Sequence, residues 1–185
     1  MVKNMNALVA GSLESLDQMI GFISELSDTE YQYIARPWFD SSIGQHLRHI
    51  VDLYRALQVT NSIADSDLPF IDYDTRRRGA PIETQKCVGL EELSTLRCWM
   101  SKISSDDLDK SVLVSAEVAL KSKQVELCHS SFGRELSFAS SHLVHHLAIM
   151  AAVAKMAGKD VDSSLGLAPA TATFVREGEA TVCAH

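Results

Sequence analysis

Apolar residues recur at intervals of three and four positions in four long segments, the spacing that places side chains on one face of an α-helix. In the first segment the repeating positions include Leu13, Leu16, Ile20 and Ile23. The second segment follows residues 40–42, which are good capping residues. We therefore expect helices over residues 4–26, 43–57, 90–103 and 130–157.

A different pattern separates the third and fourth expected helices. Residues 111–118 and 124–127 read as two short strands, and residues 121–123 suit the turn of a hairpin. A two-stranded hairpin is marginal on its own, so we expect it to lean on the helices. The fold class predicted from these patterns is all-α, a four-helix bundle with a small β-hairpin between its third and fourth helices.

The domain organisation expected from the length of 185 residues is one hydrophobic core. We assign residues 1–165 to the bundle and residues 166–185 to a C-terminal tail, packed on the bundle or flexible beside it. Residues 65–81 form a long connection rich in Asp, Arg, Gly and Pro. A loop of that length is often functional, so Tyr73 and Asp74 become candidates for the rim of a site.

Charge and composition exclude several classes of partner. The net charge of −7 argues against non-specific nucleic-acid binding, which requires a basic face. No uncharged apolar run approaches the ~20 residues that span a bilayer, so we expect no membrane partner. The four cysteines are scattered without a CxxC pair, which favours a reducing cytoplasm. A homodimer is compatible with the sequence because homo-oligomers are common, but no pattern demonstrates one.

The fourth expected helix carries the most informative chemistry. His142 and His146 are four residues apart, which leaves their side chains ~40° apart around the helix axis and one turn apart along it. Both rings can therefore reach one ion. His145 is rotated by ~100° from His146 and is expected to pack beside the site or face outward.

A third imidazole is available in the second expected helix, where either His46 or His49 can face the bundle axis. Three neutral imidazoles with an open fourth position form the ligand set of a catalytic zinc-type site, and nickel and iron(II) also accept imidazole nitrogen. Glu135 lies seven residues before His142, on nearly the same helical face. It is a candidate base, outer anchor or fourth ligand, although a carboxylate in a first helical turn is commonly structural.

Two segments carry a resemblance to the DinB-like superfamily of damage-inducible, metal-binding four-helix bundles. They are SIGQHLRHI at residues 42–50 and HLVHH at residues 142–146. The order of the helices and the overall length agree as well, so the resemblance covers most of the chain. It implies that His49, rather than His46, joins His142 and His146 in binding the metal, and that His145 does not bind.

The resemblance also implies a range of activities, because the group includes thiol-dependent transferases, a maleylpyruvate isomerase and the metal-binding half of sulfur-transfer enzymes. Many members have no established activity. The hairpin insertion and the tail at 166–185 depart from the pattern, so no single member's substrate is carried over to this chain.

Two functional hypotheses follow. The first is a metal-dependent enzyme in which a divalent ion, zinc, nickel or iron, activates water or a low-molecular-weight thiol for transfer, isomerisation or hydrolysis of a small-molecule substrate. The second is a non-catalytic, stress-related bundle that binds a metal or another ligand. An enzyme requires a polar position open to solvent beside the ion, whereas a structural site is closed by four protein ligands.

Overall fold

The computed structural model describes residues 5–58, 61–62 and 68–182. Its helices are α1 (Ala7–Glu25), α2 (Asp28–Gln32), α3 (Ile43–Gln58), the 3₁₀ helix η1 (Pro81–Glu83), α4 (Lys86–Met100), α5 (Ser105–Leu108), α6 (Phe132–Met156) and α7 (Pro169–Val182). Its strands are β1 (Asn61–Ser62), β2 (Pro69–Asp72), β3 (Ser111–Glu117) and β4 (Val125–Ser131).

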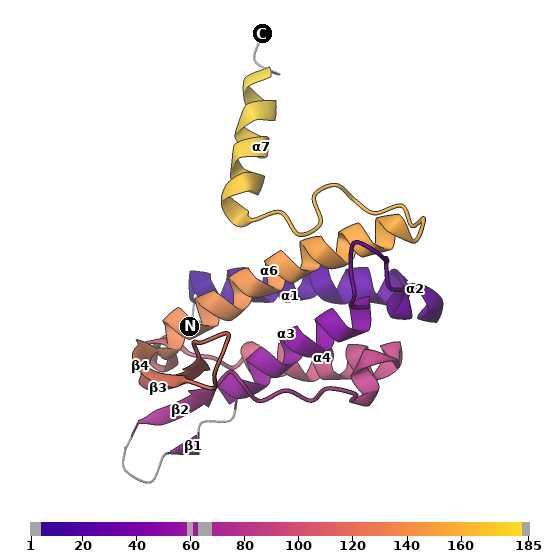
Figure 1. Ribbon diagram of the computed structural model, residues 1–185. Helices are drawn as coiled ribbons and strands as arrows, with labels where there is room; N and C mark the ends of the chain where they lie inside the picture. The colour runs from indigo at the N-terminus through magenta and orange to yellow at the C-terminus, as the bar shows by residue number, and fades with distance from the viewer. Residues whose placement is uncertain (1–4, 59–60, 63–67, 183–185) are drawn as a thin grey trace.

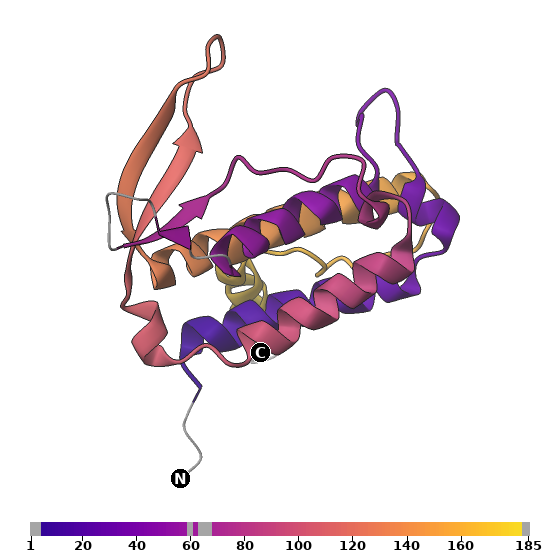
Figure 2. The ribbon, with the colours of Figure 1, turned by 90° about the horizontal axis from the view of Figure 1, so that it is seen from below.

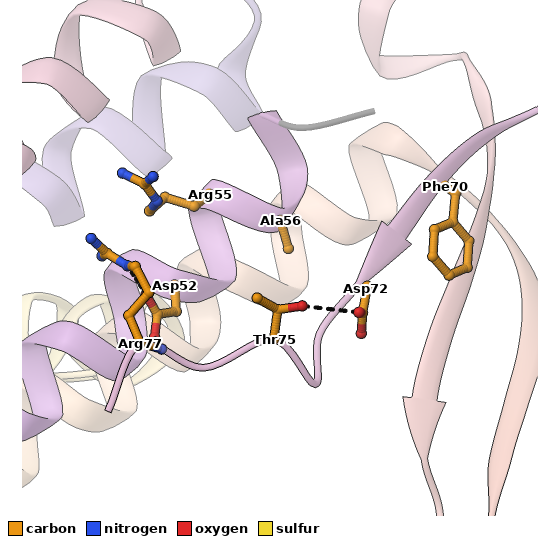
Figure 3. Close-up of a pocket in the computed structure, with 7 residues that line it drawn as sticks. All are labelled: Asp52, Arg55, Ala56, Phe70, Asp72, Thr75 and Arg77. Atoms are coloured by element: carbon orange, nitrogen blue, oxygen red, sulfur yellow. Dashed lines mark hydrogen bonds and ion pairs between the residues drawn. The ribbon is translucent and has the colours of Figure 1, made fainter. Parts of the chain in front are cut away.

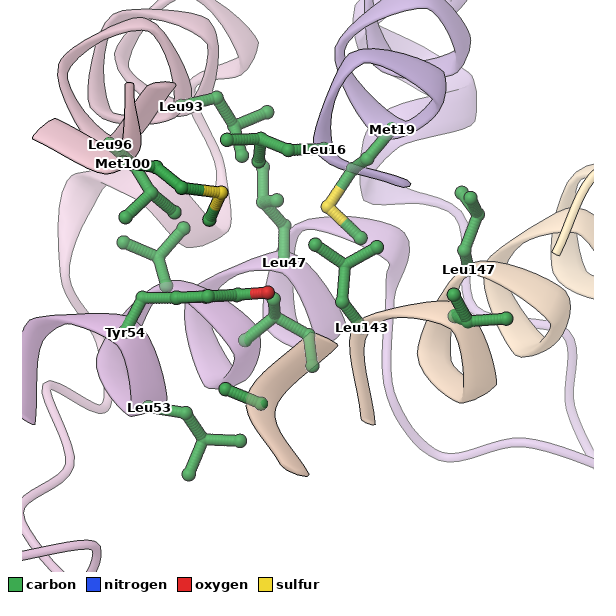
Figure 4. Packing of buried hydrophobic residues seen from close by; sticks show 14 of the residues in the cluster. Leu16, Met19, Leu47, Leu53, Tyr54, Leu93, Leu96, Met100, Leu143 and Leu147 are labelled. Carbon is green, nitrogen blue, oxygen red and sulfur yellow. The ribbon is translucent and has the colours of Figure 1, made fainter. Parts of the chain in front are cut away.

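The four long helices α1, α3, α4 and α6 surround one apolar core (Figures 1 and 2). α1 packs against α4 and α6, and α3 packs against the same two helices. Figure 4 shows the centre of this core, where Met19 from α1, Leu47 and Tyr54 from α3 and Leu143 from α6 lie together, all fully buried. The residues that repeat at helical spacing are therefore those that the core removes from water, which is the main stabilising term.

The observed helix bounds are close to those expected. α6 begins at Phe132, where the Ser131 side chain accepts a hydrogen bond from the backbone N–H of Arg134. α4 begins at Lys86 and ends at Met100, a few residues earlier at both ends than the pattern indicated. Helix ends depend on capping contacts more than on apolar spacing, which explains the offset.

The all-α fold class is wrong, because the chain also forms a four-stranded mixed sheet in the order β1-β2-β3-β4. β3 and β4 pair antiparallel as a hairpin that extends away from the helices in Figure 2. β2 pairs parallel with β3, and β1 pairs antiparallel with β2. The molecule is therefore a mixed α and β structure rather than a helical bundle alone.

The missed strands lie within the connection between α3 and α4. β2 has four residues, too few to show an alternating pattern, and it is stabilised by a partner more than forty residues away in the chain, as in the pairing of Ile71 with Val114. Non-local pairing of this kind has no local signature in the sequence. Part of the expected loop, residues 65–67, lies outside the described residues.

The C-terminal segment contains a helix, α7, which projects away from the rest of the molecule in Figure 1. Before it, Gly166 passes so close to the backbone of α6 that a Cβ would lie 2.5 Å from the nitrogen of Ala148, and its φ is 77°. Glycine is therefore required where the chain leaves α6 for α7. Residues 183–185 of the expected tail lie outside the described residues.

Helix α6, with 25 residues, is long and apolar enough to cross a membrane by length and composition alone. Half of its most apolar window is buried inside the protein, where α1 and α3 pack against it. The central helix of a soluble protein has the same composition, because it is apolar on most of its surface. Burial in the core therefore accounts for the apolar residues on the buried half of α6.

The close approach of α3 to η1 and α2 generates a test of this packing. A Cβ at Gly44 would overlap the backbone oxygen of Glu83 and lie 2.7 Å from Cε1 of Tyr31. We expect Gly44→Ala to lower the free energy of unfolding by about 1–3 kcal/mol, the usual cost of overpacking. The matched control Gly11→Ala, at an exposed position of α1 where a Cβ would have nothing within 4 Å, should raise the free energy of unfolding by up to about 1 kcal/mol.

Urea denaturation of both variants measures these changes. If the free energy of unfolding changed equally in both variants, helix propensity alone would explain the two changes. The contact between α3 and η1 would then be too loose to exclude a Cβ at Gly44.

Candidate metal centre

Helices α3 and α6 pack directly against each other and bring four histidines face to face. His46 and His49 come from α3, and His142 and His146 come from α6. The spacing of three residues on α3 and four on α6 keeps each pair on the side facing the other helix. All four side chains are partly buried.

Three of these rings surround a common point. His49 Nε2 and His142 Nε2 are 3.0 Å apart. The ring of His146 lies 4.9 Å from that of His49 and 4.6 Å from that of His142, measured between centroids. One nitrogen from each ring lies within 4.8 Å of the other two. The three residues expected to bind metal are therefore brought together.

His46 belongs to the same cluster and is not simply an alternative to His49. Its Nδ1 lies 3.0 Å from Nδ1 of His146, within hydrogen-bond distance. Its Nε2 is buried without a hydrogen-bond partner among the described residues. An imidazole that shares a proton with His146 through Nδ1 leaves Nε2 of His146 free for a ligand.

Burial lowers the pKa of all four imidazoles. The pKa of His49 falls to about 4, first through desolvation and then through the positive charge of Arg76. The pKa of His146 falls to about 3, first through desolvation and then through its neighbour His142. Desolvation is also the largest cause of the lowered pKa of His46 and His142. At neutral pH these rings are uncharged, so their lone pairs are available.

The donor set fits a divalent cation. Neutral imidazole nitrogens are ligands for zinc, nickel and iron(II). Two nitrogens that share one tetrahedral zinc lie about 3.3 Å apart, close to the 3.0 Å between Nε2 of His49 and Nε2 of His142. Within the described part of the chain the group comprises three imidazoles and no carboxylate or thiol, which leaves room for an external ligand.

Glu135 does not join this group. Its side chain is 4% exposed, and its two oxygens accept hydrogen bonds from the hydroxyl of Tyr73 at 2.8 Å and from that of Ser130 at 2.6 Å. The Phe138 ring stacks on His142, with centroids 5.8 Å apart. Glu135 is therefore hydrogen-bonded to Tyr73 and Ser130 and is not among the residues whose ligand atoms converge.

His145 is exposed, with its ring 5.4 Å from that of His146. It stands beside the cluster but is not among the three residues whose nitrogens converge. Tyr73 lies against Phe138, with ring centroids 5.6 Å apart, so it forms part of the wall next to His142. Asp74 is exposed.

The loop after β2 is held against α3 by Asp52, a buried carboxylate one turn beyond His49. Oδ2 of Asp52 accepts from Arg48 at 3.2 Å and from the backbone N–H of Arg77 at 3.0 Å. Its Oδ1 accepts from Nε of Arg77 at 2.6 Å. A buried carboxylate is tolerated when both of its oxygens accept hydrogen bonds from cationic and backbone donors in this way.

The same arginines extend the network to neighbouring elements. Arg48 donates to Glu83 of η1 at 2.9 Å, and Arg77 makes two hydrogen bonds to Glu92 of α4 at 3.0 and 2.8 Å. The sequence pattern did not predict this network. The spacing of Arg48 and Asp52, four residues apart on one helix, is the one local signal that could have indicated it.

A cavity of about 300 Å³ lies next to this network (Figure 3). It is lined by Asp52, Arg55, Ala56, Phe70, Asp72, Thr75 and Arg77. Its acidic groups are already engaged, since Asp72 accepts hydrogen bonds from the hydroxyl of Thr75 and the backbone N–H of Asp74. No histidine is among the described residues that line this cavity.

Comparison with known proteins gives limited information about this chain. No protein-family model matches it. It is similar to FK506-binding protein 5 of Rhizopus delemar, with 31% identity over 107 residues, which are 58% of this chain. The chain spans only 28% of that protein's length. This similarity does not establish a family for the chain. The name of the Rhizopus delemar protein refers to FK506, and that property is not transferred to this chain.

The lowered pKa values make a prediction about stability in the absence of metal. The folded state holds His49 and His146 uncharged down to a pH of about 4 and about 3, whereas unfolded histidine takes up a proton near ~6.5. As the pH falls below ~6.5, the unfolded state binds more protons, so the free energy of unfolding decreases. Above a pH of ~6.5 neither state binds these protons, so the free energy of unfolding should not be reduced by them there.

Urea denaturation in the presence of a chelator, at about pH 7.5 and about pH 5.5, measures this loss of stability. Both pH values lie above the range in which most carboxylates titrate, so the difference reports mainly on the histidines. His49→Gln should reduce the difference between the two pH values because it removes one of the buried imidazoles. His129→Gln, at an exposed position, should leave the difference unchanged. A wild-type protein that is equally stable at both pH values would contradict the described burial of the rings.

Proposed function

We propose that this protein is a metal-dependent enzyme in which His49, His142 and His146 hold a divalent cation. The observation that carries the proposal is the convergence of one nitrogen from each ring within 4.8 Å of the others. The resemblance of residues 42–50 and 142–146 to the DinB-like superfamily supports the same three ligands. Zinc, nickel and iron(II) all suit this ligand set.

Metal binding would explain why four imidazoles are buried together, an arrangement that is unfavourable when hydrogen bonds are the only compensation. Four uncharged imidazoles are desolvated at one place, and a cluster of this kind lowers stability at acidic pH without an evident structural gain. A cation that binds the folded state and not the unfolded state offsets this cost. The partial burial of His49 and His142 is compatible with access of a small molecule from solvent.

The open position determines the chemistry. When bound, the ion supplies a Lewis acid that lowers the pKa of a coordinated water or thiol. His46 orients His146 through the contact between their Nδ1 atoms, and Tyr73 and Phe138 shield the side of the cluster next to His142. We assign the reaction to transfer of a low-molecular-weight thiol, or a related isomerisation or hydrolysis, on a small-molecule substrate.

The cellular setting that we propose is the cytoplasm, where low-molecular-weight thiols are kept reduced. The acidic net charge supports a small-molecule substrate over a nucleic acid as the partner. A homodimer would be compatible with this function, which needs residues of a single chain.

The metal site is tested by a pair of variants on α6. His142→Ala should abolish stoichiometric metal in protein purified without a tag, because two remaining imidazoles bind a divalent ion far more weakly. His145→Ala, at the exposed neighbouring position, should retain it. Elemental analysis of both proteins measures the result, and metal retained by His142→Ala would remove the basis of the proposal.

Catalysis is tested separately by a panel of thiols and electrophilic or ester substrates offered to the metal-loaded protein. We expect metal-dependent turnover that falls by at least about a hundredfold in His142→Ala, since the nucleophile is generated at the ion. His145→Ala serves as the control. A protein that binds metal and turns over no substrate in the panel would favour a non-catalytic, metal-binding role instead.

A further inference from the structure

A buried hydroxyl on α1 has no hydrogen-bond partner. Ser12 is 1% exposed, and its Oγ makes no hydrogen bond within the described part of the chain. On the same helix, by contrast, the hydroxyl of Ser15 donates to the carbonyl of Gly11 at 3.0 Å. A buried hydroxyl without a partner lowers stability, because it has given up its hydrogen bonds to water. A partner supplied from outside the chain would remove this cost.

Ser12 lines a cavity of about 530 Å³ that lies between α1 and the start of α7. Val144 of α6 and residues of the connection between α6 and α7 also line it. In Figure 1 this connection runs over α6 before α7 turns away from the other helices. Cavities that hold small molecules have volumes of about 300–1,000 Å³, so the space suits a ligand of that kind.

The floor and one edge of the cavity are well defined. At Gly11, which lines it, an added Cβ would meet no atom within 4 Å, so the space reaches the backbone of α1. At the edge, Oε1 of Gln18 accepts a hydrogen bond from the backbone N–H of Gly166 at 3.3 Å. Gly166 is also packed against the backbone of α6. The connection that borders the cavity is therefore held on both α1 and α6.

The lining is mostly apolar, with its charges at exposed positions. Glu14 and Arg176 are both exposed and carry opposite charges. Ser12 is the buried polar residue among the described residues of the lining. The apolar side chains of the walls include those of Leu8, Val144, Leu167 and Ala172. A site of this composition favours an apolar body and offers one buried hydroxyl to fix its orientation.

We propose that this cavity binds a small, uncharged, largely apolar molecule whose one polar oxygen forms a hydrogen bond with the hydroxyl of Ser12. The site is separate from the proposed metal centre, because no histidine is among the described residues that line it. A serine hydroxyl can donate or accept, so an alcohol, a phenol or a carbonyl compound meets the requirement.

The test titrates the full chain with 4-butylphenol and with butylbenzene in a calorimeter. The two compounds share an apolar body and differ in one hydroxyl. The wild-type protein should bind both. Ser12→Ala should weaken the binding of 4-butylphenol about fivefold, the effect of one hydrogen bond, and should leave that of butylbenzene within about twofold.

A matched pair of glycine variants on α1 tests the location. Gly11→Phe places a ring in the open space of the cavity and should weaken the binding of both compounds at least about tenfold. Gly21→Phe adds the same ring at an exposed position that also has open space but does not line the cavity, so it should leave both affinities unchanged. The thermal midpoint of each variant confirms that it is folded.

Three outcomes would overturn the proposal. If the wild-type protein binds neither compound up to its solubility, the cavity is not a ligand site, as expected where a second copy of the chain covers it. If Gly11→Phe binds both compounds as the wild type does, they bind elsewhere. If Ser12→Ala changes both affinities equally, the hydroxyl of Ser12 does not recognise the ligand.

Discussion

Asp52 is the buried charge on which the arrangement of the site depends. A carboxylate on α3 with 5% of its surface exposed is stable only because Arg48 and Arg77 satisfy its oxygens. Those two arginines in turn bind acids of η1 and α4. One residue thus joins α3, η1, α4 and the loop after β2, one turn from His49.

This network also separates two kinds of polar group. The buried acids around α3 and at the start of α6 are engaged by arginines or hydroxyls, as Glu135 is by Tyr73 and Ser130. The imidazoles face one another instead, without a carboxylate in their group among the described residues. A cluster of neutral imidazole donors of this kind is suited to a divalent cation.

The sequence predicted the four long helices α1, α3, α4 and α6 and the two histidines of α6 that face the same way, because both depend on local periodicity, whereas it did not predict α7. The spacing of His142 and His146 placed their rings on one helical face, whereas the pattern of α3 left either His46 or His49 as the third ligand and only the family resemblance favoured His49. The sequence could not show that His46 and His49 both enter the cluster, since their relative orientation depends on how α3 and α6 pack. The sheet and the partners of Asp52 depend on contacts between distant segments, which leave no local pattern.

The sheet missed from the sequence has a direct consequence for the site. The backbone N–H of Tyr73 donates to the carbonyl of Ser115 at the end of β3, and β4 leads directly into α6 at Phe132. The start of the loop is therefore fixed next to the first turn of α6, while Asp52 fixes its later part on α3. Arg76 lies between these two anchors. A bundle of helices alone would hold the imidazoles, whereas the position of the loop after β2 also depends on the strands.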